Sequence, residues 1–245
     1  MTDNANRLLG ALRAADLERL SPRLTACDFE PGHVLHRAGD AVRYAWFPCG
    51  ASLATFVVTL EPGVIVEAAM VGREGAIGGI VSHGRLPAYA DVQVLHGGPF
   101  LRIDAAGLED IKGQSPAVAN LLARYADCLL AQMLQSVACN AGHTITQRTA
   151  KWLTAAIDRT GDHVVPLRQD QLADMLGVGR SFVNRVLASL RESGVLTTRR
   201  GSLLIDDMTA LKALACPCND RLRDHFEAVL AGVYPDPADP EAAPS

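Results

Sequence analysis

The chain has 245 residues, of which 49% are hydrophobic and 20% charged, so it can bury a core and is not disordered throughout. The longest apolar candidate, Ala51–Leu60, stops at Glu61-Pro62-Gly63, well short of the about 18 residues of a membrane span. The first 20 residues lack the apolar core of an export signal. We therefore expect a cytoplasmic protein with no membrane partner and with reduced cysteines.

Charge is distributed unevenly along the chain. The net charge is −4, yet residues 144–212 hold ten Lys and Arg against seven Asp and Glu, and the rest of the chain holds thirteen against twenty. An acidic body joined to a mildly basic C-terminal part is compatible with a DNA-binding protein, although chance can produce the same bias.

Residues 8–114 are expected to form an antiparallel β-roll that begins with a short helix. Leucines at near-helical spacing predict the helix over residues 8–20. Short β-rich runs separated by Pro and Gly follow, which is the spacing of strands in a barrel or roll. These runs are Tyr44–Phe47, Ser52–Leu60, Val64–Val71, Asp91–Leu95 and Phe100–Ile103.

A long helix is predicted over residues 115–142. Ser115 is a preferred N-cap, Pro116 is a preferred first helical residue, and no further Gly or Pro occurs before Gly142. Apolar residues lie on two sides of this helix, so both sides must be buried. One side can cover the β-roll, and the other can pair with a second copy of the chain as a dimerisation helix. The alternative is the central helix of a monomeric core.

The stretch Gln171–Leu190 has the pattern of a helix-turn-helix. Apolar residues within Leu172–Leu176 form one face of a short helix, and Gly177 can end it in the left-handed conformation. A second amphipathic helix is then predicted over Arg180–Arg191. Two helices that cross closely need small residues at their contact, and Ala173 and Gly177 provide them. Residues 143–215 are therefore predicted to be a winged helix-turn-helix domain.

The second helix of this motif exposes a face suited to reading bases. Arg180, Ser181, Asn184 and Arg185 point away from its apolar face. Such a helix enters the major groove by its N-terminal end, and arginine is the usual bidentate donor to guanine. These four residues are therefore predicted to contact DNA.

A β-hairpin with a basic tip is predicted after Gly194. Arg199 and Arg200 lie at its tip and are expected to contact phosphate or the minor groove. Gln169, just before the first helix of the motif, completes the predicted DNA-contacting set. A protein-binding helix pair and a merely solvated hairpin are the alternatives, but the two features in this order favour double-stranded DNA.

Together these features resemble the Crp/Fnr family of bacterial transcription regulators over roughly residues 8–215. The resemblance rests on Pro31-Gly32-His33-Val34-Leu35 with Gly39-Asp40, on Val71-Gly72-Arg73-Glu74-Gly75, and on Leu172-Ala173 through Arg180 and Arg185. It implies an α+β fold: an N-terminal cyclic-nucleotide-binding-like antiparallel β-roll, a long central dimerisation helix and a C-terminal winged helix-turn-helix.

The resemblance also implies a mode of action. It implies a homodimer on a two-fold-related DNA site with half-sites about 34 Å apart, an effector domain that changes the poise of the DNA-binding units, and RNA polymerase as a further partner. Family members that read DNA with Arg-Glu-x-x-x-Arg have glutamate where Ser181 stands, so the preferred DNA sequence is left open.

The effector region departs from the cyclic-AMP-binding members of the family. In those members an arginine–serine pair follows the glycine–glutamate stretch, whereas this chain has Ala88-Tyr89 there and Arg85 displaced. An enclosed phosphate without a paired charge is poorly held, so we expect an unknown small effector rather than cyclic AMP. The candidate effector-pocket residues are Gly72, Glu74, Arg85, Tyr89 and Met133, of which Gly72 and Glu74 are first interpreted as structural turn residues.

The six cysteines predict no cofactor. Only Cys27 lies in the N-terminal region, which argues against the iron–sulfur cluster of the oxygen-sensing branch. Cys139 and His143 have a zinc-compatible spacing but make only two ligands, so a packed cysteine and a hydrogen-bonded histidine are the simpler interpretation. Cys216-Pro217-Cys218 is a possible thiol sensor or partial metal site. Taken separately, neither pair predicts a metal.

No arrangement of residues indicates catalysis, and the protein is not expected to be an enzyme. The favoured function is a homodimeric, sequence-specific transcription regulator. The alternatives are a ligand or thiol-redox sensor that acts mainly through protein contacts, and a regulatory subunit of an enzyme. The effector, the promoter and the choice between activation and repression stay open. Residues 231–245, which are rich in Pro, are expected to be a disordered tail.

Overall fold

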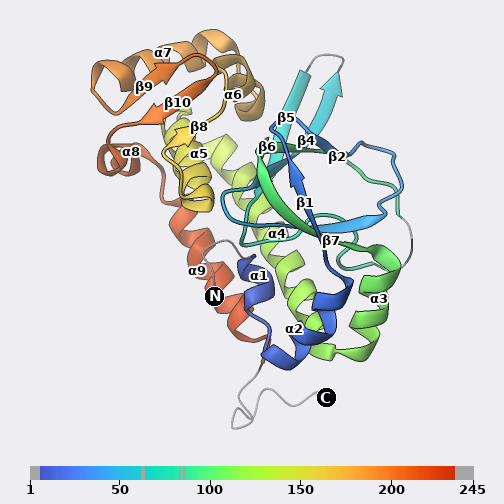
Figure 1. Cartoon of the computed structure of the whole chain (residues 1–245). Helices are drawn as coiled ribbons and strands as arrows, with labels where there is room; N and C mark the ends of the chain where they lie inside the picture. Colours follow the sequence, from blue (N-terminus) through green and yellow to red (C-terminus); the bar gives the residue numbers. More distant parts are fainter. Residues whose placement is uncertain (1–5, 62–63, 83, 85, 235–245) are drawn as a thin grey trace.

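The N-terminal half forms the predicted antiparallel β-roll (Figure 1). The computed structural model of the chain describes residues 6–61, 64–82, 84 and 86–234. Two sheets face each other in the roll, with strand orders β1-β7-β3 and β2-β6-β4-β5. The strands are β1 (Thr25–Phe29), β2 (Val34–His36), β3 (Tyr44–Pro48), β4 (Leu53–Glu61), β5 (Val64–Val71), β6 (Asp91–His96) and β7 (Gly98–Asp104).

The roll is closed at one end by short helices. The single helix predicted over residues 8–20 is broken into α1 (Arg7–Gly10) and α2 (Ala14–Leu20). The break has a physical reason, since it lets leucines from both pieces reach one core; the buried ones are Leu8, Leu9, Leu12 and Leu20. A short 3-10 turn, η1 (Ser21–Arg23), and α3 (Ala105–Gln114), which the sequence analysis did not predict, complete this end.

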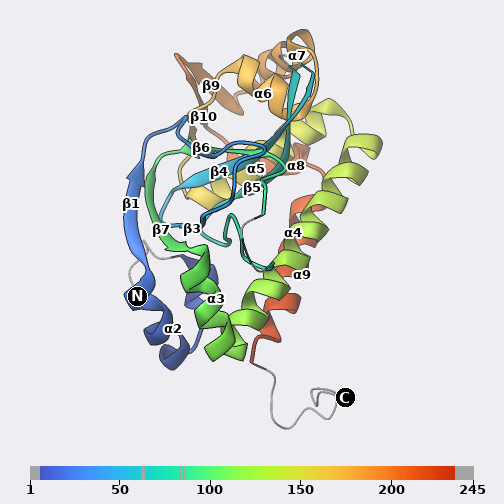
Figure 2. The same cartoon turned by 90° about the vertical axis from the view of Figure 1, so that its right-hand side faces the viewer.

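The predicted long helix is α4 (Pro116–Gly142), and it runs along the roll (Figure 2). Ser115 caps it as expected, because its side chain accepts a hydrogen bond from the Val118 amide. The face toward the roll is buried from Val118 to Gln132. The opposite face leaves four large apolar side chains exposed, namely Leu130, Met133, Leu134 and Val137.

The C-terminal part is a winged helix-turn-helix. Its three-stranded sheet has the order β8-β10-β9. The elements are α5 (Ile145–Thr160), β8 (Val164–Val165), α6 (Gln169–Leu176), α7 (Arg180–Glu192), β9 (Leu196–Arg199), β10 (Ser202–Ile205), α8 (Met208–Leu214) and α9 (Cys218–Ala231). The helix-turn-helix and the hairpin confirm the prediction, while β8, α8 and α9 were not predicted.

Helix α9 returns along α4 (Figures 1 and 2). The Phe226 ring meets Tyr125 edge-on at 6.3 Å between centroids, and Arg124 donates to the Val229 carbonyl oxygen at 2.9 Å. Beyond the helix, Val233 is buried and the Tyr234 hydroxyl donates to Asp16 at 2.7 Å. The prediction of a disordered tail from residue 231 is therefore wrong for residues 231–234, because these side chains find apolar and polar partners. The rest of that segment lies outside the described residues.

The roll and the helix-turn-helix part share one apolar core. Leu53, Met70 and Leu95 of the roll pack in the same cluster as Trp152 and Leu172 of the C-terminal part. In addition, α6 lies against β5. The described chain is thus packed continuously from the roll to the helix-turn-helix. Among the described residues, no helix is both long and apolar enough to cross a membrane.

Candidate nucleic-acid interface and effector region

The turn between α6 and α7 sets the angle of the predicted recognition helix. Gly177 ends α6 with a φ of 63°, a left-handed conformation that favours glycine. The Val178 amide then donates to the Ala173 carbonyl oxygen at 3.0 Å. One face of α7 is anchored in the shared core by Val183, Val186, Leu187 and Leu190. The opposite face of α7 is consequently held outward.

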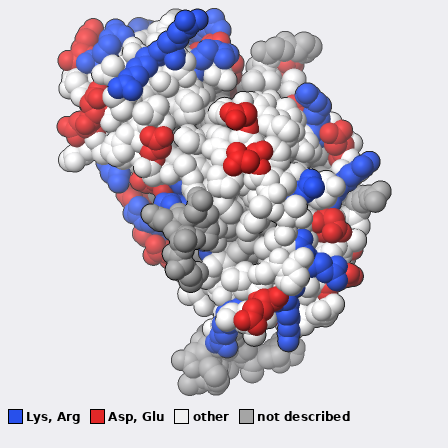
Figure 3. All heavy atoms as spheres, in the orientation of Figure 1, with Lys and Arg blue, Asp and Glu red and all other residues white. Residues whose placement is uncertain are grey.

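The outward face of α7 carries the predicted base-contacting residues. Arg180, Ser181, Asn184 and Arg185 are all exposed. The Arg185 guanidinium lies 4.8 Å from the centroid of the exposed Phe182 ring, a cation–π contact that restrains it. Figure 3 shows basic side chains gathered at the end of the molecule formed by α7 and the wing.

The wing places two further arginines at this end. Strands β9 and β10 are joined by a tight turn at Arg200 and Gly201, where Gly201 has a φ of 77°. Arg199 and Arg200 are both exposed, as is Gln169, the first residue of α6. All seven side chains predicted to contact DNA are therefore open to solvent.

An acidic residue that the sequence analysis did not single out organises this surface. Asp170 accepts from Arg180 at 3.0 Å and from Arg168 at 3.1 Å. The hydrogen bond from Arg168 is the largest of the causes that hold the pKa of Asp170 below its usual value. Its place one residue after Gln169 was visible in the sequence, but its contact with Arg180 follows only from the crossing of α6 and α7.

The glycine–glutamate turn of the roll binds the chain's own helix α5. Glu74 accepts from Arg159 Nε at 2.7 Å and from the Gly72 amide at 3.1 Å. A Cβ on Gly72 would lie 2.9 Å from the Arg159 Cβ, so only glycine lets α5 approach this closely. Both residues thus join the roll to the DNA-binding part.

The space beside this turn is filled from α4. A Cβ on Gly75 would lie 2.0 Å from the Tyr125 hydroxyl oxygen, so the buried tyrosine occupies that position. Burial raises the pKa of Tyr125 above its usual value, which keeps its hydroxyl neutral. Gln132, two turns further along α4's inner face, donates to the Met70 carbonyl oxygen at 3.0 Å.

The structure does not gather the candidate effector residues into one pocket. Tyr89 is 88% exposed, and Met133 lies among the exposed residues of α4's outer face. Arg85 lies outside the described residues. Gly72 and Glu74 are joined to α5, as above. The register of α4 turns Gln132 toward the roll in place of Met133.

A hollow lies between the Arg73–Glu74 turn, α5 and α9. Its volume is about 540 Å³. The charged side chains that line it are Arg7, Arg73, Arg159, Arg223, Glu74, Asp158 and Glu227. Basic groups outnumber acidic ones by one, and α9 forms one wall.

A second polar contact ties the roll to α5. The Glu67 carboxyl on β5 accepts from Thr55 Oγ1 at 2.7 Å and from Trp152 Nε1 at 2.8 Å. Its burial raises the pKa of Glu67, although both hydrogen bonds and the charges of Arg159 and Lys151 oppose this. Glu67 and Trp152 are 85 positions apart and meet only through the fold, so the sequence alone does not predict this contact.

Comparison with known proteins identifies the class of the DNA-binding part. Residues 147–214 match the Crp-like helix-turn-helix domain. This range runs from α5 through α8 and includes the exposed face of α7. Comparison with curated protein sequences finds no match.

Solved structures match the fold over most of the chain. FixK2 from Bradyrhizobium japonicum is 16% identical with a TM-score of 0.65, covering 79% of this chain and 98% of that one. A Crp/Fnr-family putative transcriptional regulator from Eubacterium rectale is 18% identical with a TM-score of 0.63, covering 84% and 96%. A CRP-family transcriptional regulator from Thermus thermophilus is 19% identical with a TM-score of 0.62, covering 76% and 95%.

The chain carries a Crp-like helix-turn-helix domain at residues 147–214, and its described part has the fold of the Crp/Fnr transcription regulators. The resemblance seen in the sequence and the predicted α+β architecture are confirmed.

Proposed function

We propose that the chain is a homodimeric transcription regulator that reads a specific DNA sequence with α7 and the wing. The observation that carries this proposal is the outward face of α7, where Arg180, Asn184 and Arg185 stand exposed beside the wing arginines. Side chains with these donors suit base edges in the major groove, while Arg199 and Arg200 suit phosphates. Gln169 and Ser181 extend the same surface.

A second copy of the chain is the proposed occupant of α4's outer face. Leu130, Leu134 and Val137 follow the spacing of a coiled-coil seam on a helix whose other face is already buried. Smaller residues continue the stripe toward both ends of the helix, namely Ala119, Ala123, Ala126 and Ala141. A two-fold helix pair would place two recognition helices on two half-sites.

The effector is proposed to differ from cyclic AMP. Ala88-Tyr89 stands where cyclic-AMP-binding members of the family have the arginine that pairs with the cyclic phosphate. In addition, Tyr125 fills the space next to Gly75. With a DNA partner we expect the protein in the cytoplasm, and RNA polymerase is the further partner that the family resemblance suggests.

Selection of a preferred site from a random duplex library, followed by affinity measurements, tests the proposal. Arg185→Ala should cost about 1–3 kcal/mol on the selected site and relax selectivity at one base position. Arg23→Ala, which removes the same charge from the roll, is the matched control and should leave selectivity unchanged. Undiminished selectivity of Arg185→Ala would refute the role of α7. Equal affinity of the native protein for random and selected duplexes would favour the sensor that acts through protein contacts.

A further inference from the structure

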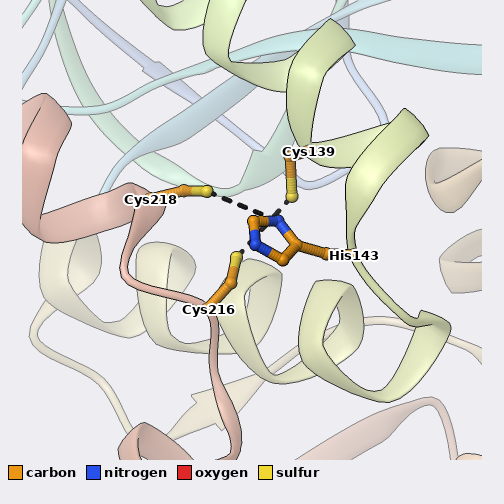
Figure 4. A group of neighbouring side chains, drawn as sticks. All are labelled: Cys139, His143, Cys216 and Cys218. Carbon is orange, nitrogen blue, oxygen red and sulfur yellow. Dashed lines mark hydrogen bonds between the residues drawn. The ribbon is translucent and has the colours of Figure 1, made fainter.

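Four side chains with metal-binding atoms converge where the dimerisation helix meets the DNA-binding part. They are Cys139, His143, Cys216 and Cys218, and their ligand atoms all lie within 4.8 Å of one another. Figure 4 shows the three sulfurs around the imidazole of His143. All three cysteines are buried. In the sequence these residues form two separate pairs, and each pair alone is half a site.

The fold brings the two pairs together at two helix ends. Helix α4 ends at Gly142, and the His143 amide donates to the Cys139 carbonyl oxygen at 3.0 Å, which brings the imidazole back beside the Cys139 thiol. Cys216 precedes α9, and Cys218 is its first residue. Asn219 fixes this end of α9 by donating to the Lys151 carbonyl oxygen on α5 at 2.9 Å.

The spacing of the four groups suits one tetrahedral ion. Cys139 Sγ lies 3.6 Å from Cys216 Sγ, and Cys218 Sγ lies 3.7 Å from His143 Nδ1. Tetrahedral zinc with bonds of about 2.3 Å to sulfur places its ligand atoms about 3.8 Å apart. A cluster of several irons would need its ligands spread more widely than this group is.

We propose that Cys139, His143, Cys216 and Cys218 bind a single Zn²⁺ as a structural Cys₃His site. Three thiolates and a neutral imidazole are a donor set that zinc prefers, and binding would release the three thiol protons to solvent. With four protein ligands the coordination sphere is closed, so no position is left for a substrate.

Burial raises the pKa of the Cys139 and Cys218 thiols, so thiolates here depend on the bound ion, and two features assist at Cys218. Gln135 Nε2 donates a hydrogen bond to Cys218 Sγ at 3.2 Å, the kind of outer contact that orients a ligand. Cys218 also stands at the N-terminus of the 14-residue helix α9, where the helix dipole favours negative charge.

The site would connect the end of α4 to the start of α9. Cys139 lies on α4, His143 lies in the link between α4 and α5, and Cys216 and Cys218 lie at the start of α9, which packs along α4. Zinc would thereby fix how the DNA-binding part is carried on the dimerisation helix. This inference does not depend on which DNA sequence the protein reads.

Metal analysis of the full chain, isolated without an affinity tag that binds metals, tests the proposal. We expect one zinc per chain by mass spectrometry of the elements, lost in Cys216→Ser and in Cys218→Ser. Cys27→Ser, a cysteine in the roll, is the matched control and should keep its zinc. DNA affinity is measured on the same samples, so failure of the zinc site and failure of DNA binding are told apart.

Cobalt provides a readout that does not require a folded variant. Native protein stripped of metal and titrated with Co²⁺ without oxygen should develop the strong visible bands of tetrahedral thiolate coordination, saturating at one ion per chain. Zinc should then displace the cobalt and abolish the bands. No stoichiometric zinc together with no such bands would overturn the proposal. So would bound iron, or a Cys139–Cys216 disulfide in freshly isolated, metal-free protein.

Discussion

At the scale of single residues, Asp170 pairs with two arginines at the edge of the proposed DNA-binding surface. It pairs with Arg180 at 3.0 Å and with Arg168 at 3.1 Å, and the Arg180 side chain remains 69% exposed, so DNA can compete for it. Asp170→Asn removes a negative charge next to the proposed phosphate contacts and releases Arg180. Affinity for random duplex should rise several-fold and the ratio of specific to random binding should fall.

Salt titrations of binding to selected and random duplexes measure this effect. Asp110→Asn is the matched control, because Asp110 pairs with Arg23 at 3.3 Å in the roll, away from α7. Weaker binding of Asp170→Asn to both duplexes would contradict this prediction. It would mean that the Asp170 carboxylate raises DNA affinity by orienting Arg180 more than it lowers the affinity by repelling phosphates.

Glu67 makes the stability of the molecule depend on pH. Burial raises the pKa of Glu67 above its usual value of 4.5, so in the folded chain it keeps a proton that it loses in the unfolded chain. The free energy of unfolding therefore falls as pH rises from the usual pKa of glutamate through the raised pKa. Glu67→Gln should remove this slope, since a neutral amide can still accept from Trp152.

Thermal unfolding of both proteins from about pH 5 to about pH 8 measures the slope. The wild type should lose stability across this window relative to Glu67→Gln. The basic groups that face Glu67 from α5 are Arg159 and Lys151. Identical pH profiles would show that the Glu67 carboxyl titrates normally.

At the scale of secondary-structure elements, the outer face of α4 is the proposed contact between two copies of the chain. Leu134 is 63% exposed at the centre of that face. A lysine there would bring like charges together across a two-fold helix pair, so Leu134→Lys should convert a dimer into monomers. Sedimentation or light scattering of the purified protein measures the mass.

Leu60→Lys provides the control for this substitution. Leu60 is 65% exposed on β4, so it matches Leu134 in residue type and exposure but lies on the roll. Leu60→Lys should leave the mass of the assembly in solution unchanged. A dimer that persists in Leu134→Lys would place the subunit contact elsewhere and remove the support for two recognition helices on one site.

Local signals explain which elements could be predicted. Ser115 and Pro116 mark the start of α4, and Gly177 marks the end of α6, because caps and left-handed turns depend on neighbours in the sequence. Helix α9 carries Leu222 and Phe226 at helical spacing, which is a local signal for an amphipathic helix. The register of α4 was harder, since only packing against the roll turns Gln132 inward and leaves Met133 outside.

Contacts between distant segments explain what the sequence left incomplete at the sites. Cys139 and Cys216 are 77 positions apart, and each belongs to a pair that is too small to predict a metal. The same holds for Glu67 with Trp152, which are 85 positions apart. The residue types determine which chemistry is available at each position. The residues of each group come together only when α4, α5 and α9 are packed in the fold.

At the scale of the whole molecule, a largely shielded ion pair joins the roll to the helix-turn-helix part, next to their shared core. Arg159 Nε lies 2.7 Å from Glu74 Oε1, and the two side chains are only 18% and 26% exposed. Removing one partner of a shielded pair leaves the other charge uncompensated, whereas exposed pairs contribute about 0–1 kcal/mol. The two parts should therefore be coupled through this contact more strongly than through any single pair on the surface.

Arg159→Ala should lower the free energy of unfolding by about 1–3 kcal/mol, because Glu74 would lose a charged hydrogen-bond donor. Arg23→Ala, which cuts a pair whose side chains are 43% and 59% exposed, should cost about 1 kcal/mol or less. Denaturant unfolding gives both values. Hydrogen exchange should accelerate at the Gly72 amide, which donates to Glu74, and along α5 in Arg159→Ala alone. Equal losses in both variants, with unchanged exchange at Gly72, would mean that the apolar core alone couples the roll to the DNA-binding part.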